Sequence, residues 1–183
     1  MLYERKLEVI DANILYFIGA ILFFTIGFYF QNLNLELGLI ITQYILILLP
    51  PIVYLNIKKI SVKKTMRLNK LGKKNGLLIV FITLLMYPTA VVANTLFMVL
   101  LSLLGNLNIP ELPSASSPSQ YILLMLIISM SAGICEEFFF RGFILSAYET
   151  LGKKKAIIIS SVLFGIFHFN LYNLFGPIVL GLV

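Results

Sequence analysis

Three charged side chains and one histidine interrupt the apolar stretches of this sequence, and their types and spacing could support acid–base chemistry. Glu136, Glu137 and Arg141 lie within one apolar run, and His168, the only histidine, lies in the next. A carboxylate can act as a general base on water, and an imidazole can position that water or stabilise an oxyanion. The same groups could relay protons or bind a cation in a transporter. Spacing alone does not separate these uses.

Helical geometry predicts different surroundings for the two acids. Glu137 and Arg141 are four residues apart, so they share a helix face and can pair. Glu136 is rotated by about 100° from Glu137. It is the carboxylate least neutralised within its helix, and we expect it to face a cavity. The alternative is a structural ion pair or an interfacial position, but about 24 Å of helix separate these acids from Lys153, which favours function.

The histidine shares a helix face with an aromatic residue. Phe164 and His168 are four residues apart, and about 20 Å of helix separate His168 from Lys155. If the two apolar helices are antiparallel neighbours, His168 lies near the depth of the two glutamates. A lone histidine on an apolar helix is more often a packed core residue. The spacing leaves that interpretation as open as the functional one.

The elements that must position these groups are membrane helices. Of 183 residues, 60% are hydrophobic and 12% are charged, which excludes a soluble fold of this size and a disordered chain. We expect an all-α, polytopic transmembrane helix bundle in one membrane domain, with about five full spans and a partial sixth. Prolines should bend the second span at Pro50-Pro51 and the third at Pro88. The expected spans are residues 12–30, 37–57, 77–104, 121–148 and 156–172, with 174–183 as the partial one.

Basic residues gather beside the expected spans and predict the topology. The segment 57–76 holds eight Lys or Arg and no acid, and Lys153–Lys155 follow two crossings later. The segment 105–120 has neither Lys nor Arg. The positive-inside rule then predicts a cytoplasmic N-terminus and an external loop at 105–120. The net charge of +6 is therefore a topology signal. We expect membrane lipid as a partner and no nucleic acid, although the basic loop could also bind anionic lipid.

At its charged residues the sequence resembles the CAAX prenyl protease and bacteriocin-processing (CPBP, or Abi) family of intramembrane endopeptidases. The family motif EExxxR is matched by Glu136, Glu137 and Arg141, and the motif FxxxH by Phe164 and His168. The two motifs together, separated by a basic loop, are more specific than either alone. The resemblance covers about residues 120–183, a partial protease core, whereas residues 1–104 match only as variable spanning helices.

The resemblance implies hydrolysis of a membrane-proximal peptide or protein by Glu136, Glu137, Arg141 and His168. Glu136 would activate water, Glu137 with Arg141 would orient the site, and His168 would hold water or the oxyanion, with Phe164 packing in support. The family has been described both as metal-dependent and as metal-free. We expect no cofactor, and a metal such as zinc would have Glu136 and His168 as ligands. Bacterial members are linked to bacteriocin processing or self-immunity, which implies a bacterial plasma membrane.

The family also has a third motif on a later helix, a second histidine followed four residues on by Asn or Asp. This sequence has one histidine and stops at Val183 within an apolar run. It resembles a member that ends before this motif, and the resemblance implies that this chain lacks part of the site, so that an inactive chain is one of the expected outcomes. Two other functions stay open. One is a non-catalytic membrane immunity or binding protein, and the other is a small proton or ion transporter.

Overall fold

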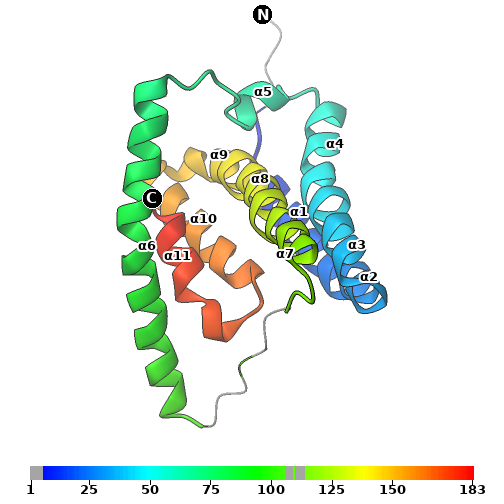
Figure 1. The fold of residues 1–183 in the computed structure, drawn as a ribbon. Helices are drawn as coiled ribbons and strands as arrows, with labels where there is room; N and C mark the ends of the chain where they lie inside the picture. Colours follow the sequence, from blue (N-terminus) through cyan, green and yellow to red (C-terminus); the bar gives the residue numbers. More distant parts are fainter. Residues whose placement is uncertain (1–5, 106–108, 110–113) are drawn as a thin grey trace, which may run out of the picture. The chain divides into compact units, whose positions relative to one another are not determined.

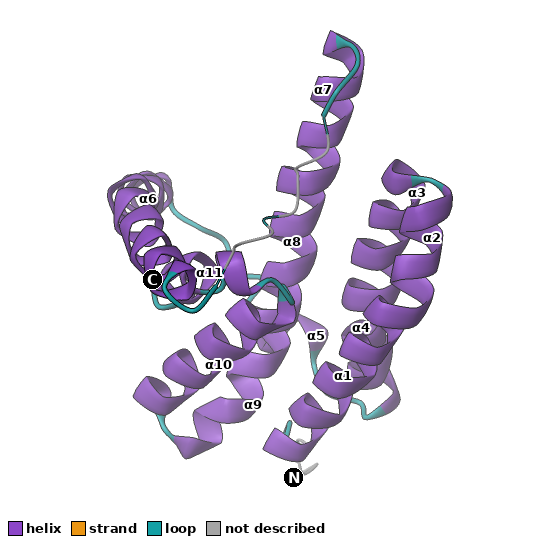
Figure 2. Cartoon of the chain, turned by 90° about the horizontal axis from the view of Figure 1, so that it is seen from below, coloured by secondary structure: helices purple, strands orange, loops and turns teal. Residues whose placement is uncertain are grey.

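The computed structural model describes residues 6–105, 109 and 114–183, and the elements in these ranges are helices (Figure 1). Figure 2 shows helices joined by loops, with no strand among the described residues. The predicted all-α fold is therefore confirmed. Residues 106–108 and 110–113 of the expected external loop at 105–120, including Pro110 and Pro113, lie outside the described residues.

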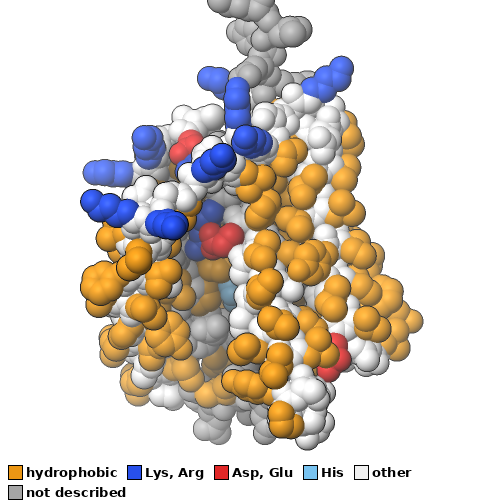
Figure 3. Space-filling model, turned by 45° about the horizontal axis from the view of Figure 1, so that its top comes forward, with side chains coloured by type: hydrophobic (Ala, Val, Ile, Leu, Met, Phe, Trp, Pro, Cys, Tyr) orange, Lys and Arg blue, Asp and Glu red, His pale blue; other side chains and the backbone are white. Residues whose placement is uncertain are grey.

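Four helical stretches are long and apolar enough to cross a membrane. Each coincides with one of the first four expected spans, and large apolar side chains are exposed along their flanks (Figure 3). The fifth expected span is the 15-residue helix α10 (Lys153–Phe167), which is shorter than the roughly 20 residues of a full crossing. The exact number of crossings stays a prediction. The four stretches are Val9–Leu33, Leu35–Ile57, Lys73–Ser102 and Pro118–Leu151.

Helix α10 ends earlier than the sequence predicted, at Phe167 rather than near Tyr172. Phe169 adopts a left-handed φ of 49°, a conformation that commonly ends helices. The amides of His168 and Phe169 donate to carbonyls three residues back, at 3.3 and 2.9 Å. The side chain of Asn170 then accepts from the amide of Tyr172 at 2.9 Å and starts a new turn. His168 therefore lies just beyond the C-terminal end of α10.

The chain forms two compact units. One comprises Met1–Leu68 and Pro113–Gly152, and the other comprises Asn69–Leu112 and Lys153–Val183. The sequence predicted a different division, between variable spanning helices at 1–104 and a partial protease core at 120–183. That division stays a prediction. The first unit contains α1 (Val9–Leu22), α2 (Phe28–Leu33), α3 (Leu35–Ile40), α4 (Leu49–Ile57), α5 (Val62–Thr65), α7 (Pro118–Met125), α8 (Ala132–Glu137) and α9 (Leu145–Tyr148). The second contains α6 (Lys73–Ser102), α10 and α11 (Phe175–Gly181).

Wider π-helical turns interrupt the long helices of the first unit. In the described part of this unit they are Phe23–Gly27, Ile41–Leu48, Leu126–Ser131 and Phe138–Ile144. The segment Ile41–Leu48 ends directly before α4, whose first turn holds Pro50 and Pro51. Proline lacks the N–H that a carbonyl four residues back would accept, and π turns are a known way of absorbing such a change. A π segment therefore lies just before the two prolines, and the bend expected there stays a prediction. The third expected span, α6, continues through Pro88.

Aromatic packing fixes the rotation of the helix that carries the first motif. Phe140 and Phe143 are completely buried. The ring of Tyr16 meets Phe140 edge-on with centroids 6.3 Å apart, and Tyr54 meets Phe143 in the same way at 6.0 Å. Because these two phenylalanines are fully buried, they fix the rotation of the helix, with Glu136 half-buried and Glu137 exposed.

Close helix packing organises the second unit, where α11 lies against both α6 and α10. A Cβ added to Gly165 of α10 would lie 2.4 Å from Cγ1 of Ile178, and one added to Gly181 of α11 would lie 2.8 Å from Cβ of Ser161. No real side chain tolerates such distances. The two glycines therefore allow α10 and α11 to approach closely and to position the end of α10.

Candidate functional site

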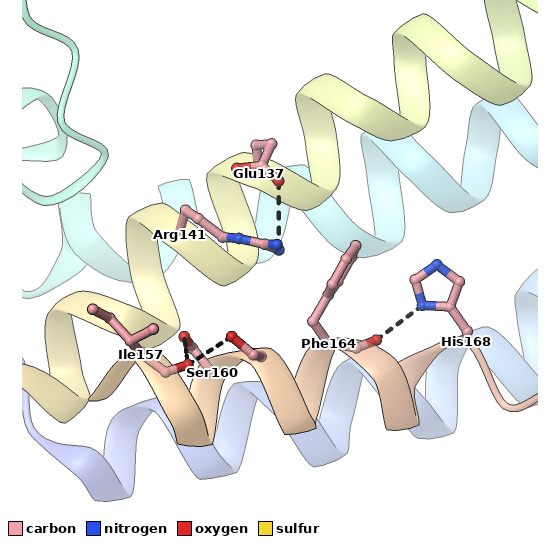
Figure 4. A network of polar contacts seen from close by, with 7 residues as sticks. Glu137, Arg141, Ile157, Ser160, Phe164 and His168 are labelled. Carbon is pink, nitrogen blue, oxygen red and sulfur yellow. Dashed lines mark hydrogen bonds and ion pairs between the residues drawn. The ribbon is translucent and has the colours of Figure 1, made fainter. Parts of the chain in front are cut away.

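The first motif lies where α8 passes into the π-helical segment Phe138–Ile144. Glu136 and Glu137 end α8, and Arg141 lies within the π segment. Nη1 of Arg141 lies 3.4 Å from Oε1 of Glu137 (Figure 4). The predicted pairing of these two residues is confirmed. The Glu137 side chain is 55% exposed, so the ion pair borders an open space rather than being sealed in the core.

Glu136 has an uncharged partner on another helix. Nε2 of Gln43, from the π segment Ile41–Leu48, donates to Oε1 of Glu136 at 3.1 Å. One residue further along, the hydroxyl of Tyr44 donates to Oγ of Ser131 at 3.1 Å. Sequence reasoning missed Gln43. The signal available was an amide side chain inside an expected apolar span.

The π segment also changes the angular relation between Glu136 and Arg141. In an α-helix, residues five apart point about 140° away from each other. In a π-helix the backbone bonds join residues five apart, which brings such residues toward one side. Most of the chain between Glu136 and Arg141 is π-helical. Positions 136 and 141 are therefore closer to one side of the helix than the α period predicts, and the ion pair of Arg141 is made with Glu137.

The second motif is closed by a hydrogen bond between its own two residues. Nδ1 of His168 lies 2.9 Å from the backbone oxygen of Phe164, and the two rings meet edge-on with centroids 4.8 Å apart (Figure 4). The backbone N–H of His168 donates to the oxygen of Gly165 and not to that of Phe164. The oxygen of Phe164 can therefore accept a hydrogen bond from the imidazole. A carbonyl only accepts, so Nδ1 must carry the proton. In the neutral imidazole, Nε2 is then an acceptor.

A cavity of about 420 Å³ opens beside His168 within the second unit. Its wall is mostly apolar, with imidazole, amide and hydroxyl side chains as the polar exceptions. Such a mixture is typical of small-molecule and side-chain binding sites. The lining includes Tyr87, Asn94, Thr95, Phe164, His168 and Leu180.

Asn94 of α6 supports the turn that follows His168. Its Nδ2 donates to the backbone oxygen of Tyr172 at 2.8 Å, and its Oδ1 accepts from the backbone N–H of Gly176 at 3.2 Å. Both backbone groups lie near the start of α11, where the backbone hydrogen bonds of a regular helix are interrupted. One amide side chain therefore replaces two missing backbone partners. Sequence reasoning missed Asn94, whose signal was again an amide within an expected apolar span.

The two motifs lie in different units, and the predicted meeting of Glu136 with His168 stays a prediction. The described residues bring no three His, Cys, Asp or Glu side chains together as ligands for a metal. Glu136 and His168 by themselves would supply two ligands. The expectation of no cofactor stays a prediction.

Comparison with known proteins gives one match. Residues 118–183 match the family model described as type II CAAX prenyl endopeptidase Rce1-like. No curated protein and no solved structure matches the chain. The matched segment contains both motifs and makes up roughly the last third of the sequence. Residues 118–183 therefore carry an Rce1-like domain, as the two motifs predicted, and the Rce1-like family is a protease family.

Proposed function

We propose that this protein hydrolyses a peptide bond at the membrane, with Glu136 as the general base. The observation that carries the proposal is the unequal partnering of the two acids in the matched segment. Glu137 is paired with the cation Arg141, whereas Glu136 accepts a hydrogen bond from the neutral amide of Gln43. A neutral donor orients a carboxylate without compensating its charge, and an oriented carboxylate can act as a general base on water.

In the proposed reaction, Glu136 takes a proton from water while the water oxygen bonds to the scissile carbonyl carbon. Glu136 then gives this proton to the leaving nitrogen as the carbon–nitrogen bond breaks. The Nδ1–H of His168 is engaged by Phe164. In its neutral form His168 would therefore use Nε2 to accept a hydrogen from the water, rather than donate to an oxyanion. The Arg141–Glu137 pair would orient the acids and offset the charge that builds up on the substrate.

The proposed substrate is a peptide or protein segment next to the membrane, in bacteriocin processing or self-immunity. We place the protein in a bacterial plasma membrane with its N-terminus in the cytoplasm. The basic residues of segments 57–76 and 153–155 support this orientation. The proposal includes metal-independent hydrolysis.

The experiment is cleavage of a membrane-tethered reporter peptide in proteoliposomes that contain the purified chain. Glu136→Gln keeps the shape of the side chain and removes the base, so the rate should fall by about 10²- to 10⁴-fold. Glu36→Gln is the matched control, because Glu36 lies outside both motifs and its Oε1 accepts a hydrogen bond from Nε2 of Gln120 at 3.2 Å. Equal rates for Glu136→Gln and the unsubstituted protein would contradict the proposal. Proton flux that depends on Glu136 without cleavage would indicate a transporter.

A further inference from the structure

Gln43 carries a hydrogen-bonding group that its present contact does not use. The side chain is 7% exposed, and its Nε2 donates to Glu136. Its Oε1 is buried and has no hydrogen-bond partner among the described residues. Buried polar atoms are nearly always hydrogen-bonded, so an acceptor without a donor needs a reason.

The protonation state of Glu136 supplies that reason. A carboxylate only accepts hydrogen bonds, and so it offers nothing to Oε1 of Gln43. A carboxylic acid presents an O–H donor beside a C=O acceptor, and an amide presents an N–H donor beside a C=O acceptor. The two groups are therefore complementary when the acid is protonated. The proposed reaction protonates Glu136 in every cycle.

We propose that Gln43 is a positioning residue that pairs with Glu136 in both of its protonation states. In the resting state Oε1 of Glu136 accepts from Nε2 of Gln43, as the structure has it at 3.1 Å. When water transfers its proton to the other carboxyl oxygen, the new O–H donates to Oε1 of Gln43. The carboxyl group thus keeps its orientation between taking the proton and returning it to the leaving nitrogen. The catalytic consequence rests on the proposed function, whereas the pairing itself does not.

The neighbouring contacts provide a matched control. Tyr44 is adjacent to Gln43 and binds Ser131 through its hydroxyl at 3.1 Å. Tyr44→Phe removes one hydrogen bond between the same two long helices and leaves Glu136 untouched. Gln43→Met keeps the length and approximate volume of the side chain and removes both amide atoms. Gln43→Asn keeps the amide but shortens its reach, and is the second variant if Gln43→Met does not fold.

The first readout is the kinetics of reporter cleavage in proteoliposomes. Gln43→Met should lower kcat by about 10- to 100-fold, while KM changes by less than about threefold. Gln43→Asn should lie between Gln43→Met and the unsubstituted protein, and Tyr44→Phe should keep its kcat within about twofold. An unchanged kcat in folded Gln43→Met overturns the positioning role. An equal loss of kcat in Tyr44→Phe also overturns it, because helix packing would then explain the effect.

The second readout does not require activity. Infrared difference spectra recorded as the pH is lowered report the C=O stretch of protonated Glu136, assigned by its loss in Glu136→Gln. Hydrogen bonding lowers this frequency, so the band should move to higher wavenumber in Gln43→Met and stay in place in Tyr44→Phe. A band that does not move in Gln43→Met overturns the pairing. If the band moves but the unsubstituted chain cleaves no peptide, the pairing stands and the proposed function fails.

Discussion

The two motifs are fixed in place by different means. In the first unit, the acids are positioned by side chains, with Gln43 contacting Glu136, Arg141 contacting Glu137, and buried aromatic rings setting the rotation of the helix. In the second unit, His168 is positioned by backbone, through the carbonyl of Phe164 at a helix end. The difference indicates that side-chain truncation should disturb the first motif most. Changes in backbone spacing or backbone hydrogen bonding should disturb the second.

The largest effect should come from the aromatic core beneath the first motif. Phe143 is completely buried against Tyr54, and Phe143→Ala should lower the free energy of unfolding by about 3–5 kcal/mol. Denaturant unfolding in mixed micelles measures the loss. Phe17, whose ring is 64% exposed, supplies the control variant Phe17→Ala. Similar losses for both variants would show that this core does not fix the first motif.

A smaller loss should follow from removing the side chain that supports the turn after His168. Asn94→Leu leaves the oxygen of Tyr172 and the N–H of Gly176 without their partner, which should cost about 2–4 kcal/mol in unfolding free energy. Thr83→Val on the same helix removes only a local bond to Ile79 and should cost less than about 0.5 kcal/mol. The same unfolding measurement compares the two, and equal stabilities would contradict the role assigned to Asn94.

The close approach of α10 and α11 should respond to a single methyl group. A Cβ on Gly165 would lie 2.4 Å from Cγ1 of Ile178 and 2.9 Å from the oxygen of Leu174, so Gly165→Ala should cost about 1–3 kcal/mol in stability. In α8, a Cβ on Gly133 would meet nothing within 4 Å. Gly133→Ala should therefore gain up to about 1 kcal/mol from the better helix former. The opposite signs in thermal unfolding are the test, and a gain at Gly165 would refute it.

The smallest effect should be the coupling between Glu137 and Arg141. A double-mutant cycle with Glu137→Gln and Arg141→Met should give a coupling below about 1 kcal/mol, because the Glu137 side chain is 55% exposed. Unfolding free energies of the four proteins supply the cycle. A coupling of several kcal/mol would mean that the ion pair, and not the aromatic core, fixes the first motif.

The sequence predicted the parts of this structure that follow from local periodicity. Apolar runs gave the first four long helices within a few residues, and the four-residue spacing gave the pair of Glu137 with Arg141. Sequence could not give the partner of Glu136, because Gln43 is 93 residues away along the chain. In a membrane protein, isolated amide side chains in apolar spans were the signal for such partners.

Backbone departures from the α-helix account for the other differences. The π segment after Glu137 alters which residues share a side, and a pattern read with the α period cannot detect it. The early end of α10 depends on the left-handed conformation of Phe169. A phenylalanine gives no sequence signal for that conformation, which glycine or asparagine more often adopts.

The lysines at the start of α10 suit the proposed membrane topology but oppose the dipole of the helix. Its first residues are Lys153, Lys154 and Lys155, and the aligned peptide dipoles of a helix place partial positive charge at this end. Each exposed ammonium group there works against the macrodipole by about 0.3–1 kcal/mol. Replacing the three lysines by glutamates would favour the isolated helix. It would also remove the charge that, in the proposed topology, decides which end of the helix remains in the cytoplasm.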